Sequence, residues 1–273
     1  MLTLAALGQK EPSMTPPHIV FVAGDHEYGG ETTLPLLAAE LERHYGLRTT
    51  VLKSFPDQNA EEDIPGLEAL ATADLAVFFL RWRRLPAEQL AHLEQYLRAG
   101  KPVIGFRTTS HGFRYPEDDP RSSWNGWAAP VFGAPPGWGV DGHTHYGHES
   151  TTIVSLLEEA AAHPILTGVR GPFEVRSWLY HVLPKWPPPD ATRLLSGRAV
   201  NPRIPAPDNP VAWAWTNDYG GRAFFTTLGH PEDFAAEPLE RVLVNAVHWC
   251  LSLPIPDPWS GPFEMASPYR GMV

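Results

Sequence analysis

The chain has 273 residues, 43% hydrophobic and 19% charged, which is ordinary globular usage and excludes a disordered or fibrous protein. Its formal net charge is −10, with 21 lysines and arginines against 31 acids, so it lacks a cationic face for the phosphates of nucleic acid or an anionic membrane, and neither is expected as a partner. No apolar run approaches the roughly 18 residues that a membrane-spanning helix needs.

Residues 1–17 precede the first predicted element and read as a disordered or leader segment. Met1 to Gly8 is apolar, without a basic start, and too short for a good secretory signal. We therefore expect a cytoplasmic protein, with export as the alternative if this stretch is the remnant of a signal. Met14 is a second candidate for the true start.

From His18 onward, short apolar runs alternate with segments of helical period, which is typical of βαβ units on a parallel sheet. The first run is apolar throughout, as expected for a strand buried on both faces. A helix with its N-cap at Thr32 or Thr33 follows it, and a second helix ends at Gly100. The predicted elements here are strands at 19–23, 49–52, 75–80 and 103–106 and a helix at 86–98.

The middle of the chain, from Thr108 to about His148, is a long loop rich in glycine, proline and tryptophan. Loops of this length in a compact domain are either functional or disordered. The tryptophans argue against disorder, because a solvated chain could not bury their apolar area. We expect this loop to cover the ends of the strands.

A hairpin is predicted late in the chain, because the apolar runs 211–215 and 223–228 flank the turn sequence Asn217 to Gly221. Its two strands are expected to lie antiparallel. The closing helix then runs from about Pro238 to Leu251.

Cys250 is the single cysteine and falls on the apolar stripe of the closing helix. One cysteine excludes a disulfide within the chain and any multi-cysteine metal site. The proline-rich tail, 254–273, either wraps over the surface or is loose. We predict one domain over 18–253.

Four predicted strands end in polar residues. In an open α/β fold, ligands bind outside the carboxyl ends of the strands, so these residues would meet at one rim. They are Asp25, His26, Glu27, Tyr28 and Glu31 after the first strand, Arg81, Trp82, Arg83 and Arg84 after the third, Arg107, Thr108, Thr109, Ser110 and His111 after the fourth, and His230, Glu232 and Asp233 after the late strand.

Each group also has a purely structural reading. The run from Asp25 to Glu31 could be a solvated loop with helix-capping acids, since acids are favoured at a helix N-terminus. The arginines at 81–84 could be a surface charge run, although arginine directly after a buried strand is well placed to hold a polyol or a carboxylate. His230 and Glu232 could pair with neighbours. The glycines after the first strand do not match G-x-G-x-x-G, which argues against a dinucleotide site.

The close spacing of His143, His145, His148 and Glu149 suggests a divalent metal, because imidazole and carboxylate are metal ligands. The spacing matches no established zinc signature and lies in a glycine-rich loop. We therefore expect no cofactor and structural or substrate-contacting histidines, with a metal on the three histidines as the alternative.

Leu228-Gly229-His230-Pro231-Glu232 resembles the His-Pro-Glu segment that supplies the catalytic histidine and glutamate of class I glutamine amidotransferases. The turn at 105–109 falls where that fold has its nucleophile elbow, Gly-x-Cys-x-Gly. Arg107 stands at the cysteine position and Cys250 lies elsewhere, so glutaminase chemistry is excluded. A serine or threonine nucleophile at Thr108 or Ser110 is disfavoured, because only Gly105 of the elbow glycines is present.

A fold of this type without its cysteine resembles the trehalose-utilisation, or ThuA-like, family, and the similarity in order and spacing runs from His18 to Leu253. Many members carry Gly-Leu-His after the fourth strand, where this chain has Gly-Phe-Arg107, with His111 four residues on. The resemblance implies a three-layer, doubly wound α/β fold with a mostly parallel sheet, flavodoxin-like or class I glutamine amidotransferase-like. It also implies bacterial carbohydrate metabolism on trehalose-like disaccharides or their oxidised derivatives. The segments that carry it are 80–83, 100–107, 110–113, 145–148, 163–165, 211–213 and 226–230.

We expect an enzyme that acts on a disaccharide or keto-sugar by acid/base chemistry. Glu27 and His230 are the predicted base and acid, Glu232 orients His230, and His111 is a further acid or base. The predicted substrate-binding residues are His26, Tyr28, Arg81, Trp82, Arg83, Arg107 and His148.

Three alternatives stay open. One is a non-catalytic sugar-binding or regulatory module, motivated by the missing nucleophile. Another is a metal-dependent hydrolase or isomerase that uses the histidine loop. Assembly into a homo-oligomer also stays open.

Overall fold

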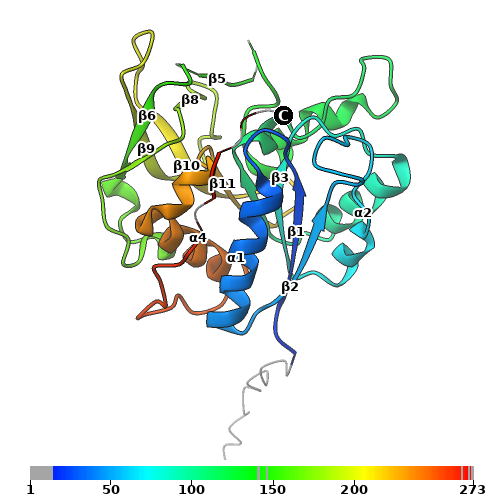
Figure 1. The fold of residues 1–273 in the computed structure, drawn as a ribbon, viewed down its shortest axis with the longest axis horizontal. Coiled ribbons are helices and arrows are strands. Elements are labelled where there is room, and N and C mark those ends of the chain that lie inside the picture. Colours follow the sequence, from blue (N-terminus) through cyan, green and yellow to red (C-terminus); the bar gives the residue numbers. More distant parts are fainter. Residues whose placement is uncertain (1–14, 140–141, 146, 266, 270, 272–273) are drawn as a thin grey trace, which may run out of the picture.

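The computed structural model describes residues 15–139, 142–145, 147–265, 267–269 and 271, and within them one mixed sheet forms the centre of the protein (Figure 1). Its strand order is β2-β1-β3-β4-β11-β10-β9-β6-β7, and β5 pairs with β8 in a separate small sheet. The strands are β1 (His18–Gly24), β2 (Arg48–Lys53), β3 (Leu75–Leu80), β4 (Val103–Phe106), β5 (Thr144–His145), β6 (Thr151–Leu156), β7 (Phe173–Val175), β8 (Tyr180–His181), β9 (Thr192–Val200), β10 (Asn209–Thr216) and β11 (Arg222–Thr226). The helices are α1 (Gly30–Tyr45), α2 (Ala87–Arg98), α3 (Ala128–Phe132) and α4 (Glu237–Cys250), with 3₁₀ turns η1 (Leu67–Thr72), η2 (Arg107–His111), η3 (Ser122–Gly126), η4 (Glu158–Ala160), η5 (Pro164–Leu166) and η6 (Pro231–Ala235).

The first half of the sheet is parallel, from β2 through β1, β3 and β4 to β11. Its strands are buried on both faces, because side chains alternate between two cores: Phe21 packs with α1 and α4, and Val22 packs with α2 and α3. The predicted α/β fold with helices on both faces is therefore confirmed, as Figure 1 shows. The predicted cap at Thr32 or Thr33 is wrong, because α1 begins at Gly30 after a left-handed Gly29 with φ 67°.

The second half of the sheet is antiparallel. The predicted hairpin of β10 and β11 is present, and β9, β6 and β7 extend the sheet beyond it. The sequence analysis did not identify these three strands. Strand β9 alternates poorly between buried and exposed positions and carries Gly197 in its interior, so it gives no clear strand signal.

The tail after α4 packs against the domain and runs up to the rim of the sheet (Figure 1). Phe263 and Met265 are buried in the core beside α1 and α4, and Tyr269 stacks on Tyr28 with 6.0 Å between ring centroids. Cys250 is buried, as the helical stripe predicted. Residues 1–14 of the predicted leader lie outside the described residues. Within those that are described, no helix is long and apolar enough to cross a membrane.

Candidate functional site

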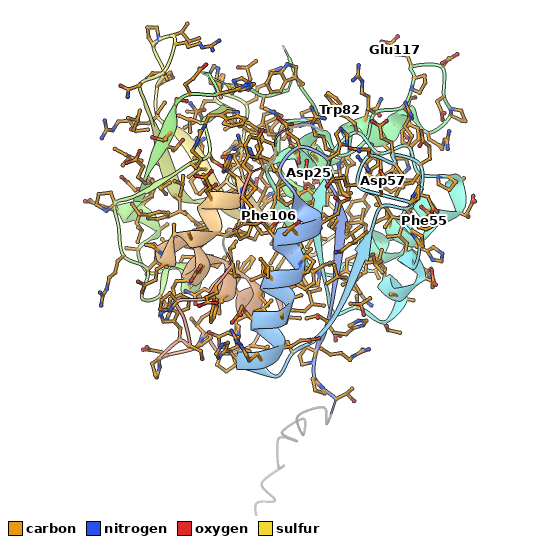
Figure 2. All side chains as sticks on the ribbon, in the orientation of Figure 1. Asp25, Phe55, Asp57, Trp82, Phe106 and Glu117 are labelled. Atoms are coloured by element: carbon orange, nitrogen blue, oxygen red, sulfur yellow. The ribbon has the colours of Figure 1, made fainter. Side chains whose placement is uncertain are left out.

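A cavity of about 270 Å³ lies where β1, β3 and β4 end, under the loop that the sequence predicted as a cover. Figure 2 shows Asp25 and Trp82 at this end of the sheet. Three strand ends contribute to the cavity, and the middle loop and β8 close it from above. It is lined by Glu27, Tyr28, Arg81, Trp82, His111, Trp138, His145, His148 and Tyr180.

The turn after β1 is held by the buried carboxylate of Asp25. This carboxylate accepts hydrogen bonds from the backbone N–H of Tyr28 at 2.6 Å, from that of Glu27 at 3.3 Å and from the Thr108 hydroxyl at 3.1 Å. Burial, reinforced by the nearby charge of Glu27, raises the pKa of Asp25 to about 6. Asp25 thus fixes the backbone that carries the Glu27 side chain to the cavity wall.

Glu27 is oriented by Arg81, which follows β3. The Arg81 Nε lies 2.7 Å from Glu27 Oε2, and the Arg81 guanidinium stacks on the Trp82 ring at 3.4 Å from its centroid. All three side chains line the cavity, so the predictions for them agree with their position. The arrangement places a carboxylate, a fixed positive charge and an aromatic wall together.

His26 and Arg83 lie behind this pair and do not line this cavity, so their predicted contact with substrate stays a prediction. The His26 ring is held between Arg81, at 2.7 Å from Nη1 to Nε2, and Arg83. Burial and the charges of Arg83 and Arg81 lower the pKa of His26 to about 4. Arg83 is fully buried and donates to the carbonyls of Arg81 at 2.7 Å and Ala60 at 2.6 Å. Both residues support Arg81.

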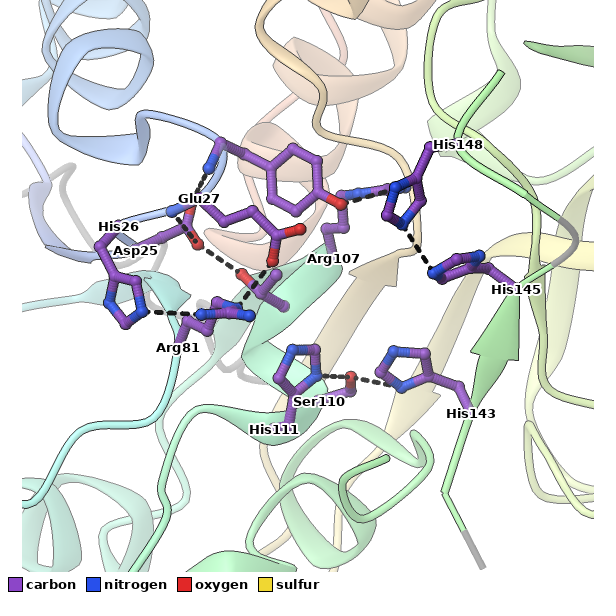
Figure 3. A network of polar contacts seen from close by, with 12 residues as sticks. Asp25, His26, Glu27, Arg81, Arg107, Ser110, His111, His143, His145 and His148 are labelled. Carbon is purple, nitrogen blue, oxygen red and sulfur yellow. Dashed lines mark hydrogen bonds and ion pairs between the residues drawn. The ribbon is translucent and has the colours of Figure 1, made fainter. Parts of the chain in front are cut away.

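His111, the last residue of η2, lines the cavity and belongs to a hydrogen-bonded relay (Figure 3). The Ser110 hydroxyl lies 3.1 Å from His111 Nδ1 and 3.1 Å from His143 Nδ1. A hydroxyl donates one proton, so it donates to one ring and accepts from the other. The relay therefore has two arrangements, in which His111 presents either an Nε2–H or an Nε2 lone pair to the cavity.

Both rings of this relay are neutral at physiological pH. Burial, reinforced by His143, lowers the pKa of His111 well below 6.5. Burial and the charge of Arg107 lower the pKa of His143 to about 3. A neutral imidazole has one nitrogen that can accept a proton and one N–H that donates a hydrogen bond, so each ring can take up a proton on one side while it is held on the other.

His145 and His148 form a second pair on the cavity wall, with 2.9 Å between their Nε2 atoms. The Gly147 N–H donates to His145 Nδ1 at 3.3 Å, so neutral His145 carries its proton on Nε2 and donates it to His148. His148 packs on the Trp178 ring at 4.6 Å between centroids and lines the cavity, and its contact with substrate stays a prediction.

The predicted set of three metal-ligating histidines is divided in the structure. His143 is fully buried, stacks on Tyr180 at 4.1 Å and directs Nδ1 to Ser110, away from the pair formed by His145 and His148. Over the part of the chain that the structure describes, no three histidine, cysteine or acidic side chains are grouped as metal ligands.

His230, the predicted catalytic acid, is fully buried and does not line the cavity. The rings of Tyr269, Trp178 and Tyr28 enclose it, at 4.5, 6.1 and 6.2 Å between centroids. Burial, with the charge of Arg107, lowers the pKa of His230 to about 3. Aromatic side chains from distant segments cover the ring, so its predicted role as the catalytic acid stays a prediction that this geometry does not support.

Glu232 does not orient His230 as predicted. Its side chain is exposed, and its backbone N–H, not its carboxylate, contacts His230 Nδ1 at 3.2 Å. The neighbouring Asp233 is the buried acid of this turn, and it accepts from the backbone N–H groups of Gly229 at 2.9 Å and Ser177 at 2.8 Å.

Arg107 lies under the floor of the cavity and does not line it, so its predicted substrate contact stays a prediction that this geometry does not support. The side chain is fully buried beneath Tyr28, Tyr180 and Trp178, with its Cζ 4.5, 4.3 and 4.7 Å from their ring centroids. It donates to the Thr227 carbonyl at 2.7 Å and to the Tyr28 hydroxyl at 3.3 Å. Its backbone is left-handed, with φ 39°, which matches the tight turn expected of the elbow position.

Sequence reasoning missed Tyr180 and the role of Ser110 and His143. Tyr180 comes from the two-residue strand β8, which is too short to leave a periodic pattern. The relay joins Ser110 to a residue 33 positions later, a contact that no local spacing predicts. The pair Trp178 and Tyr180 was the available signal, but nothing in the sequence placed it beside the rim.

Comparison with known proteins agrees with this architecture. A family model described as trehalose utilisation, ThuA, matches residues 34–250. A ThuA-like protein from Parabacteroides merdae has a similar structure, with a TM-score of 0.64 and 15% identity over 88% of this chain and 92% of that one. One from Bacteroides uniformis gives 0.59 and 16% identity over 89% and 95%. At these identities the likeness concerns the fold. No curated protein matches the chain.

Proposed function

Because the chain belongs to the trehalose-utilisation family, we propose that it is an enzyme of carbohydrate metabolism that acts on a disaccharide or its keto derivative by acid/base chemistry. One observation carries the proposal: Glu27, Arg81 and His111 follow three neighbouring strands and line one cavity together with tryptophan side chains. Small-molecule sites combine such apolar walls with a few convergent polar groups.

Each of these residues has a distinct role. Glu27 is the base, held by Arg81 in a fixed orientation. His111 is its partner: its Nε2 exchanges a proton with the substrate, while its Nδ1 is held by the Ser110 hydroxyl, whose second contact is His143. Arg81 brings a positive charge that stabilises an oxyanion as it develops on the sugar. Trp138 provides an exposed apolar face for a sugar ring, and Trp82 supports the Arg81 guanidinium that stacks on it.

Glutaminase activity is not part of this proposal. Arg107 occupies the elbow position, and Cys250 is buried on α4 with its thiol 3.9 Å from the Val103 carbonyl. Burial raises the pKa of the Cys250 thiol, so it is not a thiolate nucleophile.

The test is product analysis by NMR with trehalose and its 3-keto derivative. We expect the Glu27→Gln variant to lose about 10²- to 10⁴-fold in turnover, the usual contribution of a general base. Glu232→Gln is the matched control, since this exposed glutamate lies outside the cavity, and it is expected to keep wild-type turnover. Equal turnover in both variants would contradict the assignment of Glu27.

The same samples distinguish an enzyme from a sugar-binding module. A sugar at 100 times its dissociation constant adds about 2.7 kcal/mol to the free energy of unfolding, which raises the melting temperature visibly. A rise in melting temperature without product in the wild-type protein would favour the non-catalytic module.

A further inference from the structure

A second cavity, of about 370 Å³, adjoins the first. Trp82, His111 and Trp138 line both cavities, and Arg114 and Asn125 line the second one alone. Three shared side chains therefore divide one depression at the end of the sheet into two compartments.

His111 lies between the two tryptophans at this division. Its ring centroid is 6.3 Å from that of Trp82 and 6.4 Å from that of Trp138. Trp138 is 55% exposed, which is unusual for so large an apolar side chain. Exposed aromatic faces beside polar groups suit the faces of sugar rings, which are apolar at C–H groups and polar at the edge.

Trp82 is fixed in place by its backbone. Its φ of 56° lies in the left-handed region, which a bulky residue adopts at a cost and which is common in functional sites. Its N–H donates to the His111 carbonyl at 3.0 Å, so the turns after β3 and β4 are joined at the division. The wall between the two compartments is thus rigid and tied to His111.

The second compartment has its own polar groups. The Arg114 guanidinium is exposed and lies 4.8 Å from the Trp82 ring centroid, and among the described residues it has no hydrogen-bond partner. Asn125 is held by two hydrogen bonds with the Tyr115 backbone, at 2.8 and 3.0 Å, and forms a fixed wall. Arg114 therefore offers several N–H donors to a sugar hydroxyl.

We propose that the second cavity binds the second ring of a two-ring glycoside, with the bond between the rings beside His111. This inference rests on the proposed function and assigns a binding place to the second ring of its substrate. The first cavity, at about 270 Å³, is slightly smaller than the roughly 300–1,000 Å³ of small-molecule sites, and the second, at about 370 Å³, lies at the low end of that range. Each compartment is suited to one ring and the two together to a disaccharide.

The experiment is calorimetric titration of the wild-type protein and of Arg114→Ala with trehalose, its 3-keto derivative and glucose. Arg198→Ala is the control, since it removes an exposed arginine outside both cavities. We expect at least one of the two-ring sugars to bind wild type more than tenfold tighter than glucose. Arg114→Ala should reduce this preference about tenfold and leave glucose binding unchanged, and Arg198→Ala should change neither.

Outcomes separate the two proposals. If glucose binds as tightly as both disaccharides, or if Arg114→Ala and Arg198→Ala act alike, the second subsite is wrong and the catalytic assignment stands on its own test. If the preference for two rings depends on Arg114 but Glu27→Gln keeps full turnover, the subsite stands and the catalytic assignment falls. If none of the three sugars binds wild type, both proposals are overturned.

Discussion

The turns after β4 and β11 resemble each other in structure but differ in what surrounds their histidines. The two strands are parallel neighbours, and each is followed by a 3₁₀ turn that carries a histidine, His111 in η2 and His230 before η6. His111 lines the cavity, whereas His230 is enclosed by Tyr28, Trp178 and Tyr269.

The difference arises in segments far from both turns. The end of a parallel strand brings a side chain to the rim of the sheet, but the segments that pack above decide whether it meets a ligand. Trp178 and Tyr269 close the turn after β11, and the loop with Trp138 leaves the turn after β4 open to the cavity. The first turn is therefore expected to serve function and the second to serve stability.

The largest expected effect on stability comes from the closed turn. Asp233→Ala removes the acceptor of the Gly229 and Ser177 N–H groups, which stay buried and unpaired, whereas the His230 N–H keeps the Ser177 hydroxyl as an acceptor. We expect a loss of about 3 kcal/mol in the free energy of unfolding, because each buried unsatisfied donor costs roughly 1–3 kcal/mol. Urea unfolding measures this free energy, and a loss below about 1 kcal/mol would show that Asp233 contributes little to the stability of the fold.

The free energy of unfolding is expected to depend on pH through Glu31, which lies in the first turn of α1. Burial, reinforced by the charge of Asp25, raises the pKa of Glu31 to about 8. A carboxyl with a raised folded-state pKa stabilises the fold below its unfolded pKa of about 4.5, and this contribution is lost as the pH rises through 8. Glu31→Gln should therefore be more stable than wild type at pH 9, by an amount on the order of a few kcal/mol, and similar to it at pH 4.

The measurement for Glu31 is the melting temperature of both proteins between pH 4 and pH 9. Glu68→Gln is the control, since Glu68 is exposed on η1 and should give a constant difference from wild type. A Glu31→Gln curve parallel to that of wild type would contradict the raised pKa.

A smaller effect is expected in the open turn. Ser110→Ala removes the hydroxyl that joins His111 to His143. Loss of one hydrogen bond of about 1 kcal/mol predicts roughly a fivefold fall in kcat with little change in KM. Steady-state kinetics distinguish this from a binding defect, and an unchanged kcat would show that the relay does not act in turnover.

The smallest expected effect is that of metal removal. His143 contacts Ser110, so it is not grouped with His145 and His148 as a third ligand, and we expect turnover to be independent of metal. Dialysis against a chelator should leave the turnover within about twofold of that of the untreated protein, a difference of about 0.4 kcal/mol in activation free energy. Loss of activity that zinc or another divalent ion restores would contradict this expectation.

Much of the parallel half of the sheet was predictable from the sequence, because its strands are continuous apolar runs separated by segments of helical period. The strand ends that carry Glu27, Arg81 and His111 followed from the same pattern. The sequence did not show that Asp233, and not Glu232, is the buried acid of the turn after β11, or that Arg107 is buried. Both depend on which distant segments pack above each turn.

The central claim is that His111, not His230, exchanges a proton with the substrate. The most direct test compares turnover of the wild-type protein with that of His111→Gln and His230→Asn on the two-ring substrate. Asparagine keeps an acceptor for the Glu232 N–H and so preserves the cap of η6. We expect a loss of about 10²- to 10⁴-fold for His111→Gln and near wild-type turnover for His230→Asn. The reverse order, in folded proteins, would contradict it.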